Sequence, residues 1–161
     1  MLILGIDPGL ATIGFGLVAK NGDKYRAIEY GAITTAPKQI IEKRLDDIFT
    51  DMMDILQRYK PDCMAIEELF FNNNTTTAID VAMARGVILL AAHKCGVDVY
   101  EYTPLEVKSS VVGYGRAEKQ QVQYMVKLML NLKETPKPDD TADALALALC
   151  HGTRMSAIPI K

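Results

Sequence analysis

The chain opens on a nearly unbroken apolar run, LILGID at Leu2–Asp7, which ends on a carboxylate and a Pro8-Gly9 turn signal. A continuous apolar run of this length is typical of a strand that is buried on both faces. The run therefore predicts an inner strand of a sheet that is covered on both sides. It also places Asp7 at the end of a buried strand, where a charged group needs a partner.

The segments that follow predict an antiparallel meander and then a helix. A second strand is expected over Ile13–Lys20, the Asn21-Gly22 pair marks a tight hairpin, and a third strand is expected from about Lys24 to Thr35. Apolar residues then recur every three or four positions, which predicts an amphipathic helix over Gln39–Tyr59.

Short apolar segments alternate with helical ones in the rest of the chain. The expected elements are a strand over Cys63–Ile66 running into Glu67-Glu68, a helix over Ala78–Cys95 that Thr75–Thr77 can cap, a strand over Val97–Tyr102, and helices over Pro104–Val112, Ala117–Leu130 and Asp140–Cys150, the last stopped by Gly152. An antiparallel meander followed by β-α crossovers predicts an α/β fold with one mixed five-stranded sheet and helices on both faces. The length of 161 residues fits a single domain over residues 1–161.

Composition narrows the class of protein without identifying it. No apolar run approaches the roughly 20 residues that span a bilayer, and the first residues offer no signal-peptide cleavage site. The cysteines Cys63, Cys95 and Cys150 are odd in number, far apart and set in apolar stretches. We expect reduced structural thiols and a cytoplasmic location, rather than a disulfide framework or a zinc site.

Four acidic residues stand beside segments that are expected to be buried. Asp7 and Glu67 each end a buried strand, and Asp140 and Asp143 lie in the first turn of an apolar helix. If the two strands are parallel neighbours, Asp7 and Glu67 emerge at the same sheet edge, and residues three apart lie about 60° apart on one helix face. Taken singly, these acids suit turns, solvated ends and helix caps. Taken together they favour a site for Mg²⁺ or Mn²⁺, which prefer oxygen ligands.

The formal net charge of −2 argues neither for nor against DNA as a partner. Phosphate contacts require Lys and Arg. However, cations bound by carboxylates cancel part of the acidity, and a local basic patch matters more than the total charge.

Successive segments resemble, in order, the motifs of the RuvC family of crossover junction endodeoxyribonucleases: ILGIDPGLATIGFG, AIEELFF, ARGV, VKSSVVGYGRAEKQQV and DDTADALALAL. The resemblance spans nearly the whole chain. It implies an RNase H-like fold and a Mg²⁺-dependent endonuclease, in which Mn²⁺ can substitute, that resolves four-way Holliday junctions by symmetric nicking in recombination and repair. It further implies a homodimer that cooperates with the RuvA and RuvB branch-migration proteins.

The resemblance also implies that Asp7, Glu67, Asp140 and Asp143 are the catalytic acids and metal ligands. Asp143 falls on a position that also bears His in the family. Asp139 is an extra acid beside the motif, and both Asp139 and Asp140 share a helix face with Asp143. The three-residue spacing of the family motif favours Asp140, which leaves Asp139 free to serve as the helix N-cap.

Aromatic and basic residues provide candidates for DNA contact. Phe70 and Phe71 open a polar loop, where they either anchor the loop or stack on unpaired bases. The resemblance favours Phe70 as the base-contacting aromatic, and it favours Lys108 and Lys119 as phosphate-binding residues in a Gly-containing segment. Lys119 can also help to neutralise charge in the transition state.

Three further features are interpreted from local context. Metal-assisted hydrolysis needs no nucleophilic side chain, so His93 and His151 are expected to be structural. Arg85, on an otherwise apolar helix, can pair with an acid. The helix Ala78–Cys95 is a candidate dimer interface, because its Ile88-Leu89-Leu90 run exceeds what one buried face needs.

Other classes of function remain open at this point. Asp7 with Gly9, Gly14 and Gly16 also resembles the first phosphate loop of actin-like and sugar-kinase ATPases, although those proteins need two such domains. A catalytically silent junction-binding protein and another RNase H-like nuclease with a different substrate are the remaining alternatives.

Overall fold

The computed structural model describes residues 1–69 and 75–156. The elements along the chain are β1 (Leu2–Asp7), β2 (Thr12–Asn21), β3 (Lys24–Thr34), α1 (Ile41–Tyr59), β4 (Cys63–Glu67), α2 (Thr75–Lys94), β5 (Asp98–Tyr102), α3 (Pro104–Val112), α4 (Lys119–Met129) and α5 (Asp139–Ser156). This order of strands and helices confirms the sequence prediction.

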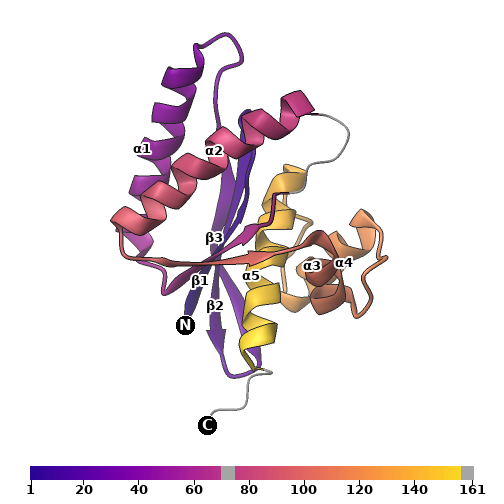
Figure 1. Ribbon diagram of the computed structural model, residues 1–161. Helices are drawn as coiled ribbons and strands as arrows, with labels where there is room; N and C mark the ends of the chain where they lie inside the picture. Colours follow the sequence, from indigo (N-terminus) through magenta and orange to yellow (C-terminus); the bar gives the residue numbers. More distant parts are fainter. Residues whose placement is uncertain (70–74, 157–161) are drawn as a thin grey trace.

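The five strands form one mixed sheet in the order β3-β2-β1-β4-β5. β1 pairs with β2 in antiparallel fashion and with β4 in parallel fashion, so the predicted inner strand lies at the centre of the sheet. Helices α1 and α2 cover one face, and α5, with α3 and α4 beside it, covers the other (Figure 1). The prediction of an α/β fold with helices on both faces is therefore confirmed.

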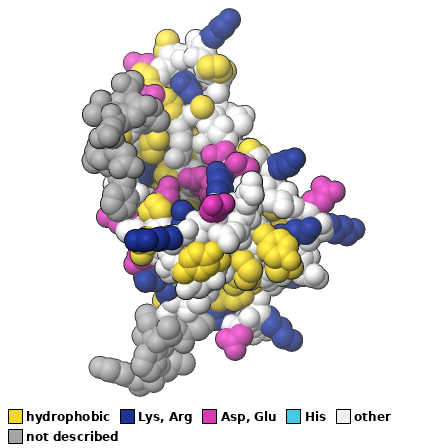
Figure 2. Space-filling view, turned by 90° about the vertical axis from the view of Figure 1, so that its right-hand side faces the viewer, with side chains coloured by type: hydrophobic (Ala, Val, Ile, Leu, Met, Phe, Trp, Pro, Cys, Tyr) yellow, Lys and Arg dark blue, Asp and Glu magenta, His cyan; other side chains and the backbone are white. Residues whose placement is uncertain are grey.

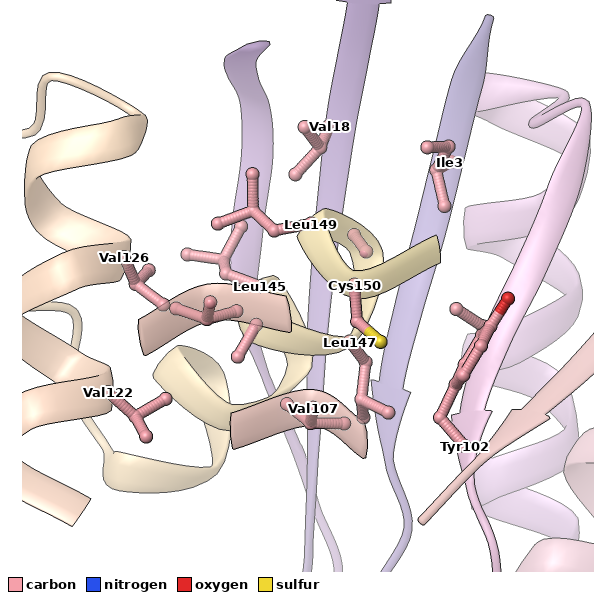
Figure 3. Close-up of a cluster of buried hydrophobic side chains, with 14 of the residues drawn as sticks. Ile3, Val18, Tyr102, Val107, Val122, Val126, Leu145, Leu147, Leu149 and Cys150 are labelled. Carbon is pink, nitrogen blue, oxygen red and sulfur yellow. The ribbon is translucent and has the colours of Figure 1, made fainter. Parts of the chain in front are cut away.

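The apolar run of β1 is continuous because each face of the strand meets a different core. Leu4 and Ile6 are fully buried in the core beneath α1 and α2. Ile3 is fully buried on the opposite face, in the core that contains Leu145 and Leu149 of α5 (Figure 3). Full burial of an aliphatic side chain of this size stabilises the fold by about 1.5–3 kcal/mol. The two cores together hold β1 rigidly between the helical layers.

Glycines let α5 lie directly on the sheet. A Cβ atom at Gly5 or Gly14 would collide with the backbone of Ala144 or Asp140, respectively. A Cβ atom at Gly16 would lie 2.6 Å from Cδ2 of Leu145. The glycines of β1 and β2 therefore provide the close approach that brings the start of α5 to the end of β1.

Some predicted element bounds were wrong. Helix α1 begins at Ile41, and Ile40 precedes it with 71% of its surface exposed. Helix α2 begins at Thr75, so the threonines belong to the helix itself. Helix α5 continues through Gly152 to Ser156 rather than stopping there. Gly152 serves close packing, since a Cβ atom would lie 2.6 Å from Cε1 of Tyr25.

Within the described ranges, none of the helices combines the length and the apolar character that crossing a membrane would require. The cysteines Cys63, Cys95 and Cys150 are all free thiols, as the sequence predicts.

Candidate active site

Two strand ends place the first pair of acids. In the parallel pairing of β1 with β4, Ile6 lies beside Ile66, so the next residues along each strand, Asp7 and Glu67, leave the sheet at the same edge. This confirms the relationship that the sequence predicts for two parallel neighbours. Both side chains are half-buried, because β1 and β4 are inner strands of the sheet.

The first turn of α5 brings the second pair of acids to that edge. Asp140 and Asp143 are half-buried, and the backbone of Asp140 lies against Gly14 of β2. Gly14 is in turn the residue that pairs with Asp7 across the β1–β2 ladder. The four acids thus come from three elements that meet at one point, β1, β4 and the start of α5.

A cavity of about 240 Å³ opens at this point. Its polar lining consists of Asp7, Glu67, Asp143, Lys108 and Lys119. Its apolar wall is formed by side chains of α3, α4 and α5, which are Pro104, Val107, Val122, Ala146 and Leu147. In the space-filling view, acidic side chains gather around a basic one in the middle of the face (Figure 2).

The acids perturb one another strongly. Burial, followed by the negative charges of Glu67, Asp143 and Asp140, raises the pKa of Asp7 from its ordinary value of 3.8 to about 8. Burial and the charge of Asp143 also raise the pKa of Glu67. Burial and the neighbouring negative charges therefore both disfavour ionisation of Asp7 and Glu67, and a bound cation would oppose both effects.

Lys119 is the cation that the chain itself supplies. Its ammonium lies 3.0 Å from Oδ2 of Asp143 and 3.4 Å from Oδ2 of Asp139. Burial lowers the pKa of Lys119, but its hydrogen bonds and charge interactions with Asp143 and Asp139 outweigh that effect and raise it. Burial raises the pKa of Asp143, and Lys119 opposes that shift.

The donor set suits a hard divalent cation. The candidate ligands of the cavity are carboxylate oxygens, which Mg²⁺ and Mn²⁺ prefer, and burial together with their mutual repulsion raises the pKa of Asp7. Within residues 1–69 and 75–156, however, no three acidic, histidine or cysteine side chains converge closely enough to form a ready-made metal cluster. The ammonium of Lys119 lies against Asp143, one of these acids. Asp7, Glu67 and Asp143 line the cavity and Asp140 does not, so ligation by all four acids would require side-chain movements that bring their oxygens together.

Asp139 and Asp140 are adjacent in sequence but differ in their surroundings. Asp140 is one of the charges that raise the pKa of Asp7. The side chain of Asp139 is 63% exposed and points to α4, where it contacts Lys119 and Gln123. Helix α5 begins at Asp139, so this residue lies in the first turn and the prediction that it is the N-cap was wrong.

Of the residues predicted to contact DNA, some lie at the cavity and others lie outside the described residues. Lys108 lines the cavity with Lys119, whereas Phe70 and Phe71 lie outside the described residues. Arg85 forms an ion pair with Glu101 at 2.7 Å, as the sequence suggests, and its Nε also donates to the backbone carbonyl of Glu67 at 3.4 Å.

The histidines lie apart from the residues that line the cavity. His151 is buried, with its Nδ1 2.7 Å from the hydroxyl of Tyr102, which agrees with a structural role. His93 is exposed near the end of α2.

Sequence reasoning missed two contributors to the site. Gly14 was interpreted as part of a strand, a family motif and a possible phosphate loop, and its contact with Asp140, which helps to admit α5, was not foreseen. Gln123 was not considered. It lies one helical turn after Lys119, and this i, i+4 spacing could have indicated that the two side chains share a face of α4.

Comparison with known proteins gives a consistent result. Residues 3–151 match the model of the family described as crossover junction endodeoxyribonuclease RuvC. The RuvC of Halothermothrix orenii is 59% identical over 152 residues, which cover 94% of this chain and 92% of that protein. The RuvC of Alkaliphilus metalliredigens is 57% identical over 151 residues, which cover 94% of this chain and 92% of that protein.

Solved structures agree with the sequence comparison. The structure of Thermus thermophilus RuvC in complex with a Holliday junction substrate superimposes with a TM-score of 0.93 and 39% identity, covering 98% of this chain and 96% of that one. The yeast mitochondrial Holliday junction resolvase Ydc2 shares the fold, with a TM-score of 0.68 at 16% identity, covering 96% of this chain and 80% of that one.

Proposed function

This chain belongs to the RuvC family of crossover junction endodeoxyribonucleases, and on that premise we propose that Asp7, Glu67, Asp140 and Asp143 are its catalytic metal ligands. The fold is RNase H-like, and the activity is that of an endonuclease that hydrolyses phosphodiester bonds to resolve Holliday junctions. One observation carries the assignment of ligands. Four carboxylates from three elements meet at one edge of the sheet, where burial and then the negative charges of the other three raise the pKa of Asp7 to about 8.

We propose Mg²⁺ as the cofactor, with Mn²⁺ able to replace it. Divalent cations held by these oxygens would activate water and neutralise charge that develops at the scissile phosphate. The chain itself supplies the ligands, two at strand ends and two at the start of α5, and the ammonium groups of Lys108 and Lys119 in the cavity. Those ammonium groups would attract and orient the phosphate backbone.

The substrate is proposed to be a four-way DNA junction, as in the complex of the Thermus relative. Phe70 is proposed to contact bases near the junction centre; it follows Glu67, which lines the cavity, by three positions in the sequence. The alternative of an ATPase loop loses its support, because Gly14 and Gly16 are accounted for by the packing of α5.

The assembly is proposed to be a homodimer of single RNase H-like domains, each formed by residues 1–161. Symmetric cutting of two strands requires two active sites, which a two-fold dimer provides. Of the run Ile88-Leu89-Leu90, Ile88 is fully buried in the core, whereas Leu90 is 49% exposed. Helix α2 also exposes Ile79 (57%), and these two exposed side chains suit an interface on this helix. RuvA and RuvB are proposed as partners in a cytoplasmic pathway of junction processing.

One experiment compares substrates directly. The protein is incubated in Mg²⁺ with a four-way junction, a linear duplex of the same sequence and an RNA–DNA hybrid. We expect paired nicks in the junction and little cutting of the other two substrates. Equal cutting of the linear duplex, or preferential cutting of the hybrid, would assign the protein to another branch of RNase H-like nucleases.

A further inference from the structure

The two oxygens of Asp139 are both engaged by one face of α4. Oδ2 lies 3.4 Å from the ammonium of Lys119, and Oδ1 accepts a hydrogen bond of 3.1 Å from Nε2 of Gln123. Lys119 and Gln123 are four residues apart on α4, so their side chains project from the same side of the helix. The carboxylate of Asp139 therefore binds Lys119 and Gln123 of α4, and Asp139 is not among the residues that line the cavity.

Lys119 is shared between two acids of unequal burial. The side chain of Asp143 is 32% exposed and lines the cavity, whereas that of Asp139 is 63% exposed and is not among the cavity's lining residues. The ammonium of Lys119 thus lies between an inner and an outer carboxylate of the same helical turn.

The base of Lys119 is also fixed. Lys119 is the first residue of α4, and the start of that helix is held by a 2.8 Å hydrogen bond from the backbone N–H of Glu118 to Oε1 of Gln121. Because the backbone of Lys119 is held in place, its ammonium can change position only by rotation of the side chain. If Asp143 no longer paired with Lys119, Asp139 would remain as the ion-pair partner of the ammonium.

We propose that Asp139 is a positioning residue for Lys119, which it retains at the mouth of the cavity when a divalent cation takes over Asp143. This inference rests on the proposed function, because it assigns Asp143 to the metal. Asp139 stabilises the outer position of the ammonium and so weakens the competition between Lys119 and the cation for Asp143. The same contact keeps Lys119 beside the cavity, where the phosphate of a bound junction would lie. The acid beside the family motif therefore acts through the lysine rather than as a ligand.

The test is a double-mutant cycle on the binding of Mn²⁺ alone, without DNA. Dissociation constants are measured for the full chain and for Asp139→Asn, each with Lys119 intact and with Lys119→Met. With Lys119 intact, Asp139→Asn should weaken Mn²⁺ binding by about fivefold, because the ammonium is then left to Asp143. In the Lys119→Met background the same change should alter binding by less than about twofold.

A second readout separates positioning from general damage. At saturating Mn²⁺, single-turnover cutting of a four-way junction should fall about tenfold in Asp139→Asn and should recover in Asp139→Glu, whose carboxylate can still reach Lys119. Gln123→Ala should have a smaller effect in the same direction. Unchanged cutting in Asp139→Asn would overturn the proposal.

Asp140→Asn is the matched control in the same helical turn. As a proposed ligand, it should weaken Mn²⁺ binding in both backgrounds. If Asp139→Asn weakens binding equally in both, Asp139 is itself a ligand and the proposal fails. If Asp140→Asn leaves binding unchanged while the coupling between Asp139 and Lys119 persists, the proposed ligand set fails and the positioning role survives.

Discussion

Gly14 stands directly opposite Asp7 in the antiparallel ladder of β1 and β2, and the backbone of Asp140 lies where a side chain at residue 14 would be. This pairing explains how a helix start can approach a strand end. Only a residue without a Cβ atom leaves room for both the ladder and the helix. Among the glycines that admit α5, Gly14 is therefore the one that contacts the proposed ligand Asp140 directly.

The first prediction concerns this glycine. Gly14→Ala should lower the free energy of unfolding by about 1–3 kcal/mol, because the new methyl group meets backbone atoms that cannot turn aside. It should also reduce junction cutting by displacing Asp140. Gly16→Ala is the matched control on the same strand, since its methyl group meets mainly the side chain of Leu145. Denaturant unfolding and nicking assays would detect the difference; a smaller loss of cutting in Gly14→Ala than in Gly16→Ala would contradict this account.

Local patterns were sufficient to predict which residues approach the site. The run Leu2–Asp7 and the segment ending at Glu67 show in their own sequence that a carboxylate follows a buried strand. Each of these signals depends only on the hydrophobic pattern of a few neighbouring residues. The parallel pairing of β1 with β4 was a condition of that prediction, and the structure meets it.

Contacts between distant elements could not be predicted in the same way. The role of Gly14 depends on which helix crosses β2, and the placement of Asp139 depends on the side of α5 that faces α4. Gly152 was misread for the same reason, because a glycine that ends a helix and one that packs against Tyr25 have the same local signature. Such features are fixed by tertiary packing, and one sequence without its fold does not contain a local signal for them.

The second prediction concerns pH and the metal-free protein. The folded-state pKa of Asp7, about 8, exceeds its ordinary value of 3.8. A carboxyl of this kind contributes most stability below its unfolded pKa, and the contribution is lost as the pH rises through the folded pKa. In EDTA, the melting temperature of Asp7→Asn should therefore exceed that of the unmodified chain by a margin that grows from about pH 5 to about pH 8. A margin that shrinks over this interval would show that burial and the neighbouring acids do not raise the pKa of Asp7.

The third prediction concerns the choice of cation. Mg²⁺ and Mn²⁺ should both raise the melting temperature and support cutting. Ca²⁺ has longer ligand distances, about 2.3–2.6 Å against about 2.0–2.1 Å for Mg²⁺, and should permit junction binding without efficient cutting. Asp143→Asn should weaken the thermal response to Mg²⁺ less than Asp7→Asn does. Thermal melts and nicking assays in each cation provide the measurement, and full activity in Ca²⁺ would count against the proposed ligand geometry.

The fourth prediction separates base contacts from phosphate contacts. Lys108→Ala should reduce the salt dependence of junction binding by about one unit of log–log slope, because one phosphate contact is lost. Phe70→Ala should reduce cutting while leaving that slope nearly unchanged. Binding titrations over a range of salt concentrations distinguish the two. If Phe70→Ala instead lowers stability by about 3–5 kcal/mol, Phe70 is a core residue.

The most direct test of the metal-site assignment is junction nicking by Asp7→Asn. This substitution keeps the size of the side chain and removes the carboxyl group whose pKa burial and the three neighbouring acids raise to about 8. We predict a folded protein that binds four-way junctions and does not nick them in Mg²⁺, while the unmodified chain nicks them in Mg²⁺ and not in EDTA. Nicking at the unmodified rate by Asp7→Asn, or undiminished nicking by the unmodified chain in EDTA, would contradict the assignment of all four acids.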